Sequence, residues 1–284
     1  MRITDILSGK NIIVWASRLI IFLALTIVTQ IGGIIYLLCI PAFIFSKTFG
    51  LSRAWYFVMR VFIFSVFYSL ATFYIVPVLA ENNGRVPMPF AEQDSLVKPH
   101  NFLTVLLNRR YVVVNVRNVI ELAAQKTAKT YPGTITEYLE CGFPFGEYPM
   151  RPHLSHNDGR KIDISFFYFD ADIKQRTNER PSWLGYGASE GPKLGEQDQP
   201  TYCAQKGYWA YSFMKRITPQ NTRIAFDAPR NRDFMRYLLS DNRVQIIMIE
   251  PHLQTRLGLD KNNKVKSPPC ISVRHDDHIH VSIY

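Results

Sequence analysis

The pattern of apolar and polar residues divides the chain near residue 80. Residues 19–46 form a run of twenty-eight positions without a charge, and residues 61–80 form another of twenty. A helix that crosses the hydrocarbon core of a bilayer needs about 20 apolar residues, so the second run predicts one span. The first run is too long for one untilted helix. Extended back to Asn11, with Gly32-Gly33 as a turn, it predicts a tight helical hairpin. Residues 1–80 are therefore expected to be a transmembrane anchor of two or three hydrophobic helical segments.

The pattern after residue 80 is that of a folded domain. Asn82-Asn83-Gly84 and three prolines over residues 81–100 predict an irregular connector that holds this domain off the bilayer. Strand-like apolar runs cover residues 162–169, 244–250 and 278–284, and residues 232–240 have a helical pattern. Because helices and strands do not alternate regularly, residues 101–284 are expected to form one α+β domain.

Residues 174–200 interrupt these elements with many glycines, prolines and charges. A structureless connection of that length is unusual inside a compact domain. Two interpretations remain open, a variable insertion and a lid or substrate-binding loop. If the segment is a lid, its removal is expected to raise activity.

Charge gives the chain an orientation and excludes one class of partner. Residues 1–80 contain six Lys and Arg against one acid, and Lys47, Arg53 and Arg60 lie together between the apolar runs. The positive-inside rule places that segment in the cytoplasm and the domain outside. No basic stripe with interleaved aromatic residues occurs, so a nucleic-acid partner is not expected.

The four cysteines are divided between the anchor and the domain. Cys39 lies in the first apolar run and is expected to be a buried thiol. Cys141, Cys203 and Cys270 would lie outside the cytoplasm, where disulfides form. Three cysteines allow at most one internal bridge, and the sequence leaves the pair open.

Two clusters rich in histidine carry the candidate chemistry. The final strand places His278 and His280 on one face, because side chains alternate along a strand. Upstream, His156 and Asp163 stand seven residues apart, with Gly159 allowing a turn between them. His156, Asp163 and His280 together supply two nitrogens and one oxygen. That set is typical of a catalytic zinc site that keeps its fourth position for water.

At these residues the sequence resembles the penicillin-insensitive murein endopeptidases. This family belongs to a wider zinc peptidase group with the lysostaphin-type enzymes, the D-alanyl-D-alanine peptidases and the hedgehog domains. The resemblance covers roughly residues 130–284 and implies a zinc peptidase domain with a central antiparallel sheet. It rests on two motifs, His153-x-Ser155-His156-x-x-Gly159-x-x-x-Asp163 and His275-Asp276-x-His278-x-His280.

The resemblance also implies a role for each residue of the two motifs. His156, Asp163 and His280 correspond to the zinc ligands, His278 and His275 to catalytic histidines, and His153 to a substrate-binding residue at the edge of the site. Asp277 departs from the family, because an aromatic residue is expected there. An extra carboxylate would alter the substrate subsite or favour the charged forms of the neighbouring histidines.

Zinc would supply hydroxide at neutral pH, because it lowers the pKa of bound water to about 7. The chain has no His-Glu-x-x-His motif, so the proton transfers are expected to fall to His278. Histidine has an ordinary pKa of about 6.5, and activity is therefore expected to depend on pH near that value.

The sequence thus predicts a membrane-anchored zinc-dependent hydrolase that cleaves the peptide cross-links of peptidoglycan. Its domain would lie in the periplasm, anchored in the inner membrane of a bacterium. One alternative is a D,D- or L,D-carboxypeptidase acting on stem peptides, which needs a cation for the terminal carboxylate; Arg160, Arg230 and Arg274 are candidates. Another is a non-catalytic zinc-containing module that binds the wall. The presence of both His275 and His278 favours the enzyme.

Overall fold

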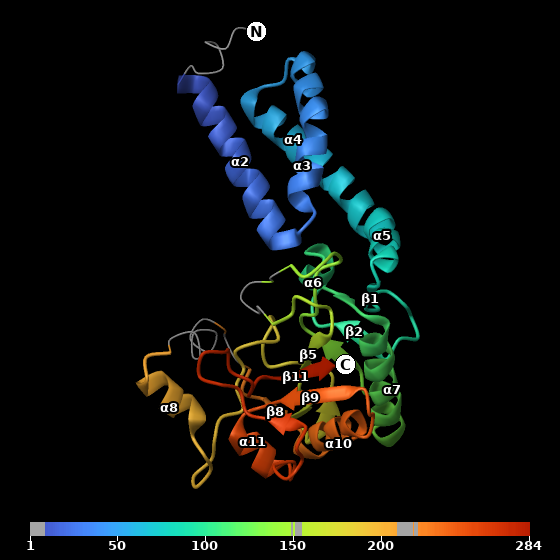
Figure 1. Cartoon of the computed structure of the whole chain (residues 1–284), viewed down its shortest axis with the longest axis vertical. Coiled ribbons are helices and arrows are strands. Elements are labelled where there is room, and N and C mark those ends of the chain that lie inside the picture. The colour runs from blue at the N-terminus through green and yellow to red at the C-terminus, as the bar shows by residue number, and fades with distance from the viewer. Residues whose placement is uncertain (1–8, 149, 151–154, 209–217, 219–220) are drawn as a thin grey trace.

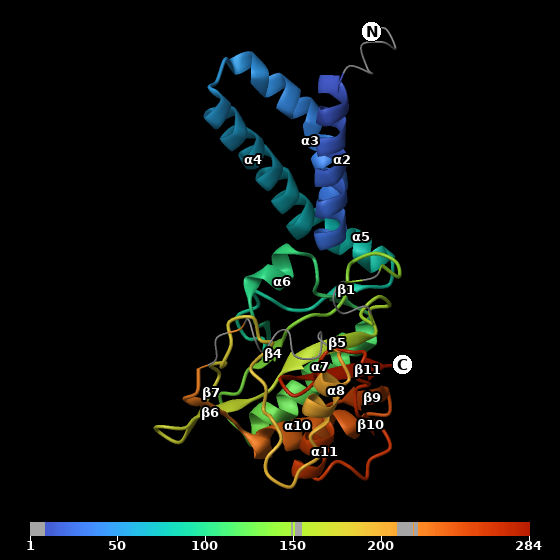
Figure 2. The same ribbon diagram turned by 90° about the vertical axis from the view of Figure 1, so that its left-hand side faces the viewer.

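A computed structural model describes residues 9–148, 150, 155–208, 218 and 221–284, with the backbone alone for residues 9–11. The chain forms two regions along its long axis, a helical bundle at one end and a mixed domain at the other (Figure 1, Figure 2). The expected α+β class is confirmed, with several-stranded sheets and three apolar helices near the N-terminus.

The bundle contains three helices that are long and apolar enough to cross a membrane. Helices α2 and α3 form the hairpin expected from the first apolar run, and α4 continues into α5 through one π-helical turn. The chain reverses at Gln30, whose φ is 65°. Gly33 is needed because a Cβ there would lie 2.0 Å from Thr26 Oγ1. The bounds are α2 Gly9–Thr29, α3 Gly32–Phe45, η1 Ser46–Phe49, α4 Arg53–Leu70, η2 Ala71–Ile75 and α5 Val76–Asn82.

The outward surface of the bundle is apolar. Ile13 is 69% exposed and Trp55 is 66% exposed, whereas few side chains are enclosed between the helices. Cys39 is one of these few, and it is a buried free thiol, as expected. A surface of this kind is stable in lipid and not in water.

A six-stranded sheet organises the domain, with its strands in the order β10-β9-β11-β5-β4-β2. The pairs β9-β11, β11-β5 and β5-β4 are antiparallel, and the pairs at the two edges are parallel. The sheet is therefore antiparallel at its centre and mixed overall. Its strands are β2 Val97–Pro99, β4 Thr136–Tyr138, β5 Lys161–Ser165, β9 Val244–Met248, β10 Val265–Lys266 and β11 His278–Ile283.

The hydrophobic core lies on one face of this sheet. Ile279, Val281 and Ile283 of β11 join it, as their alternation predicts, together with α7 (Val114–Thr130) and α10 (Ala228–Leu239). Every residue of β11 is buried, so the histidine face is covered as well.

The remaining elements extend the domain around this sheet. The strand expected over residues 162–169 is divided, because β5 ends at Ser165 and the chain enters a second sheet, β7-β6-β8. The bounds are β1 Val86–Pro87, α6 Phe102–Leu106, β3 Tyr111–Val112, β6 Tyr168–Asp170, β7 Gln175–Thr177, α8 Gln199–Gln205, β8 Ile224–Phe226 and α11 Pro251–Arg256.

Residues 81–100 are irregular over much of their length, but two short strands tie them to the domain. Strand β1 pairs with β3, and β2 pairs with β4 at the edge of the main sheet. The near end of the bundle contacts the domain directly. The Gln30 amide exchanges two hydrogen bonds with the backbone of Phe145, at 2.6 and 3.0 Å, and Tyr68 donates to the Leu106 carbonyl oxygen at 2.6 Å.

Arg85 strengthens this junction just after α5. Its side chain is buried and donates to the carbonyl oxygens of Phe143, Gly146 and Asn157. Gly159 packs against it with φ +71°, and a Cβ there would lie 2.9 Å from Arg85 Nε. One arginine therefore joins the end of the bundle to the two segments that flank His156.

Candidate metal centre

Two of the predicted ligands come from paired strands. In the antiparallel register of β5 and β11, Asp163 lies opposite His280. Residues opposite one another in such a pair share a face, so their side chains meet. His280 Nδ1 lies 2.8 Å from Asp163 Oδ1, and both side chains are buried.

The third predicted ligand comes from the loop before β5. The turn at Gly159, with its positive φ, returns the chain so that His156 lies over the sheet. His156 Nε2 lies 3.2 Å from Asp163 Oδ1 and 3.2 Å from His280 Nδ1. His156 Nδ1 donates to the Cys141 carbonyl oxygen at 2.7 Å, which turns Nε2 toward the other two side chains.

The spacing and protonation of this group suit a metal ion. A tetrahedral ion with bonds of about 2.0–2.2 Å holds its ligand atoms about 3.3–3.6 Å apart, within about half an ångström of the separations seen here. Burial lowers the pKa of His280 to about 4, and the neighbouring Asp163 only partly opposes this effect. The imidazole is therefore neutral at pH 7, which is the form that binds metals. His156, Asp163 and His280 form a buried group that could hold a metal ion.

Tyr186 supports the carboxylate of this group. Its hydroxyl donates to Asp163 Oδ2 at 2.9 Å, while Asp163 Oδ1 faces the two histidines. Burial and the nearby Asp163 raise the pKa of Tyr186 well above its ordinary value, so the phenol keeps its proton. Hydrogen bonds of this kind orient metal ligands and tune their basicity.

His278 lies beside the ligands with its orientation fixed by Asp277. Nδ1 of His278 donates to Asp277 Oδ1 at 2.5 Å, and Nε2 lies 3.7 Å from Asp163 Oδ1. Asp277 Oδ2 accepts the N–H of Gly187 at 2.5 Å. The carboxylate that replaces the expected aromatic residue therefore orients a histidine and anchors a loop.

His275 completes the cluster. The centroid of its ring lies 4.7 Å from that of His278 and 5.6 Å from that of His280. Its backbone exchanges hydrogen bonds with Glu250, from His275 N to Glu250 Oε1 and from Glu250 N to His275 O, both at 3.1 Å. Glu250 is fully buried and supports this turn.

Part of the 174–200 segment lies against the site. Besides the contacts of Tyr186 and Gly187, Glu190 N donates to the Asp276 carbonyl oxygen at 2.7 Å, and His252 Nε2 donates to the Glu190 carbonyl oxygen at 2.8 Å. Residues 186–190 therefore form part of the site. The length of the segment was the only sequence signal for Tyr186, because no periodicity marks it.

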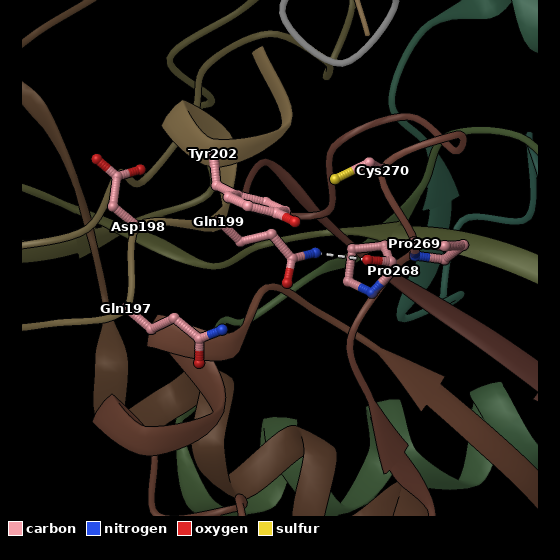
Figure 3. Close-up of a pocket in the computed structure, with 7 residues that line it drawn as sticks. All are labelled: Gln197, Asp198, Gln199, Tyr202, Pro268, Pro269 and Cys270. Atoms are coloured by element: carbon pink, nitrogen blue, oxygen red, sulfur yellow. Dashed lines mark hydrogen bonds between the residues drawn. The ribbon is translucent and has the colours of Figure 1, made fainter. Parts of the chain in front are cut away.

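A second region near this segment contains none of the three proposed metal ligands. The sequence allows at most one internal bridge among three cysteines, and the structure forms it between Cys203 and Cys270. Cys141 is a buried free thiol, and burial raises its pKa. Beside the bridge is a hollow of about 420 Å³ between α8 and residues 268–270, where the Gln199 amide donates to the Pro268 carbonyl oxygen (Figure 3). Its lining is mixed, with two glutamines and a tyrosine beside two prolines and Cys270, and Asp198 is its one charged residue. The histidine cluster does not contribute to it.

Five of the six residues that the sequence singles out meet in one buried cluster: His156, Asp163, His275, His278 and His280. The sixth, His153, lies outside the described residues. Tyr186 and Glu250 are the further residues that the structure adds to the site, and it gives Asp277 the role of orienting His278. No protein-family model and no curated protein matches the sequence.

Proposed function

We propose that this protein is a membrane-anchored, zinc-dependent peptidoglycan hydrolase that cleaves the peptide cross-links of the cell wall. The observation that supports it most strongly is the convergence of His156, Asp163 and His280 beside a second pair of histidines. The resemblance of the two motifs to murein endopeptidases supplies the substrate class.

The ligand group and its neighbours divide the chemical work. When bound, zinc supplies an acidified water and a Lewis acid for the amide carbonyl. His278 would accept a proton from the attacking water and donate it to the leaving amine. Its hydrogen bond to Asp277 suits it to this role because it directs Nε2 toward the ligands. His275, packed against the His278 ring, stabilises the charge that develops as the amide is attacked.

The distribution of cations supports a periplasmic domain. Lys47 and Arg53 lie at the end of the bundle opposite the domain, where α3 ends and α4 begins (Figure 1). The positive-inside rule assigns that end to the cytoplasm. The hairpin of α2 and α3 places the start of α2 on the same side, so three spans leave the domain outside, at the inner membrane of a bacterium.

The two alternatives have less support. A carboxypeptidase needs a cation near the metal for the terminal carboxylate. Of the three candidates, Arg230 pairs with Asp227, Arg274 pairs with Asp276, and Arg160 is exposed. A non-catalytic module has no use for a histidine oriented by Asp277 beside the ligands. We therefore retain endopeptidase as the proposed activity.

Digestion of intact peptidoglycan by the purified full chain in detergent tests the proposal. The unmutated protein should convert cross-linked muropeptide dimers to monomers. His278→Ala should keep its metal and lose this activity, whereas His280→Ala should lose both. A metal-loaded protein that leaves the dimers intact would reject the endopeptidase. Trimmed stem peptides in that digest would then favour the carboxypeptidase, and unchanged muropeptides would favour the wall-binding module.

A further inference from the structure

The bundle encloses a cavity that the proposed hydrolase does not use. Its volume is about 280 Å³, and it lies between α2, α3 and α4 toward the end remote from the domain. The polar side chains that line it are Ser17, Arg18, Tyr36, Lys47, Tyr56 and Arg60. Three cations thus face one space inside a bundle whose outer surface is apolar.

None of these cations has an anionic partner in the described part of the chain. The sequence contains no Asp or Glu between Asp5 and Glu81, and Asp5 lies outside the described residues. Arg18 contacts the ring of Trp15 at 5.0 Å, and Arg60 contacts the ring of Phe43 at 4.9 Å. The Nε atom of Arg60 is buried and has no hydrogen-bond partner among the described residues.

The depth of the two arginines favours a counter-ion. Arg18 lies six residues inside the apolar window that begins at Ile12, and Arg60 lies seven residues after the start of α4 at Arg53. At 1.5 Å per residue, both backbone positions are about 10 Å from the end of their segment. Cations at that depth are costly unless they reach the headgroups or meet an anion.

We propose that this cavity binds the phosphate headgroup of an anionic phospholipid. Guanidinium groups match phosphate oxygens in geometry and charge, and Lys47 in η1 adds a third positive group. The volume equals that of roughly nine waters at about 30 Å³ each, which is enough for a headgroup. The apolar part of the wall, including Ile21 and Ile40, favours a lipid over free phosphate because it can contact the glycerol and acyl groups.

The experiment uses the full chain in a neutral detergent and measures the thermal unfolding midpoint as lipid is added. Phosphatidylglycerol should raise the midpoint, whereas phosphatidylcholine and inorganic phosphate should not. Arg60→Lys keeps the charge but not the planar guanidinium, so it should keep only part of the shift. Arg60→Met has a side chain of similar length without charge and should weaken the lipid affinity about fivefold, as should Arg18→Met.

Arg53→Met is the matched control. Arg53 belongs to the same basic segment and counts equally in the positive-inside rule, but it does not line the cavity. Its variant should respond to phosphatidylglycerol as the unmutated chain does. Equal losses in Arg53→Met and Arg60→Met would overturn the site in favour of general surface attraction. A shift of the same size with inorganic phosphate would overturn the assignment to a lipid.

Discussion

The bundle and the domain treat polar side chains in opposite ways. In the bundle, apolar groups face outward and three of the cations gather around one internal cavity. In the domain, apolar groups form the core on one face of the sheet, and the buried histidines and carboxylates gather on the other. In both regions the group that is costly to bury marks the candidate site, because a buried charge persists only where a partner compensates it. The two regions meet at Gln30, Tyr68 and Arg85, next to the loops that carry His156.

The largest expected effect tests whether the two regions form one folding unit. Arg85→Ala removes the donors for three carbonyl oxygens, and we expect it to lower the free energy of unfolding by about 3–5 kcal/mol. The metal affinity should fall too, because Asn157 adjoins His156. Denaturant unfolding in detergent, with metal titration, measures both. Arg232→Ala removes only a partly exposed ion pair with Asp233 and should change stability by less than about 0.5 kcal/mol. Equal stability of the two variants would mean that the bundle and the domain unfold as separate units.

The metal-free domain should lose stability as the pH falls. The pKa of His280 is about 4 in the folded protein and about 6.5 in the unfolded chain, so between these values the unfolded state binds the extra proton. Stability is therefore retained above pH 6.5 and declines toward pH 4, by at most about 1.4 kcal/mol per pH unit and about 3 kcal/mol in all. Unfolding of the chelator-treated chain at several pH values measures this slope. His280→Gln should flatten the slope, and an unchanged profile would contradict the assignment.

The hydrogen bond from Tyr186 tests whether residues 186–190 support the metal centre or belong to an insertion without a role in it. Tyr186→Phe keeps the ring beside His278 and removes the donor to Asp163, so metal affinity should fall about 10–100-fold with the fold intact. Competition with a chelator of known affinity measures the change. Tyr202→Phe, at an exposed tyrosine on α8, should have no effect. If the two variants bind metal equally well, residues 186–190 do not support the site.

The smallest expected effect concerns the hairpin turn. Gln30→Met keeps the length of the side chain and leaves a non-glycine residue at the same positive φ, but it removes two hydrogen bonds to the backbone of Phe145. The free energy of unfolding should fall by about 1–2 kcal/mol. Thermal unfolding in detergent is the measurement. The near end of the bundle would be only loosely attached to the domain if the midpoint did not move.

The parts of the fold that sequence predicts are those with a local period. The β11 alternation places His278 and His280 on one face, and the uncharged runs predict the spans and the hairpin. The ligand group follows from two compact motifs. Residues whose role depends on long-range contact were not predicted. Tyr186 lies in a segment without periodicity, and β2 in a proline-rich stretch becomes a strand only because β4 offers an edge.

The role of Asp277 shows a second limit. Its position in the sequence identifies an extra carboxylate near the histidines, but orientation decides what the carboxylate does. One oxygen accepts from His278 and the other from Gly187, ninety residues away in the chain. A contact between such distant residues depends on how the 174–200 segment packs, and neither composition nor spacing encodes that directly.

The metal content of the full chain tests the central claim most directly. Elemental analysis of the protein purified in detergent and supplied with zinc should give one ion per chain. Asp163→Asn, which has nearly the same shape but lacks the negative charge, should lose that ion, as should His280→Ala, while Arg232→Ala retains it. A folded, unmutated chain that binds no metal, or an Asp163→Asn variant that binds it equally well, would contradict the claim that His156, Asp163 and His280 form a metal centre.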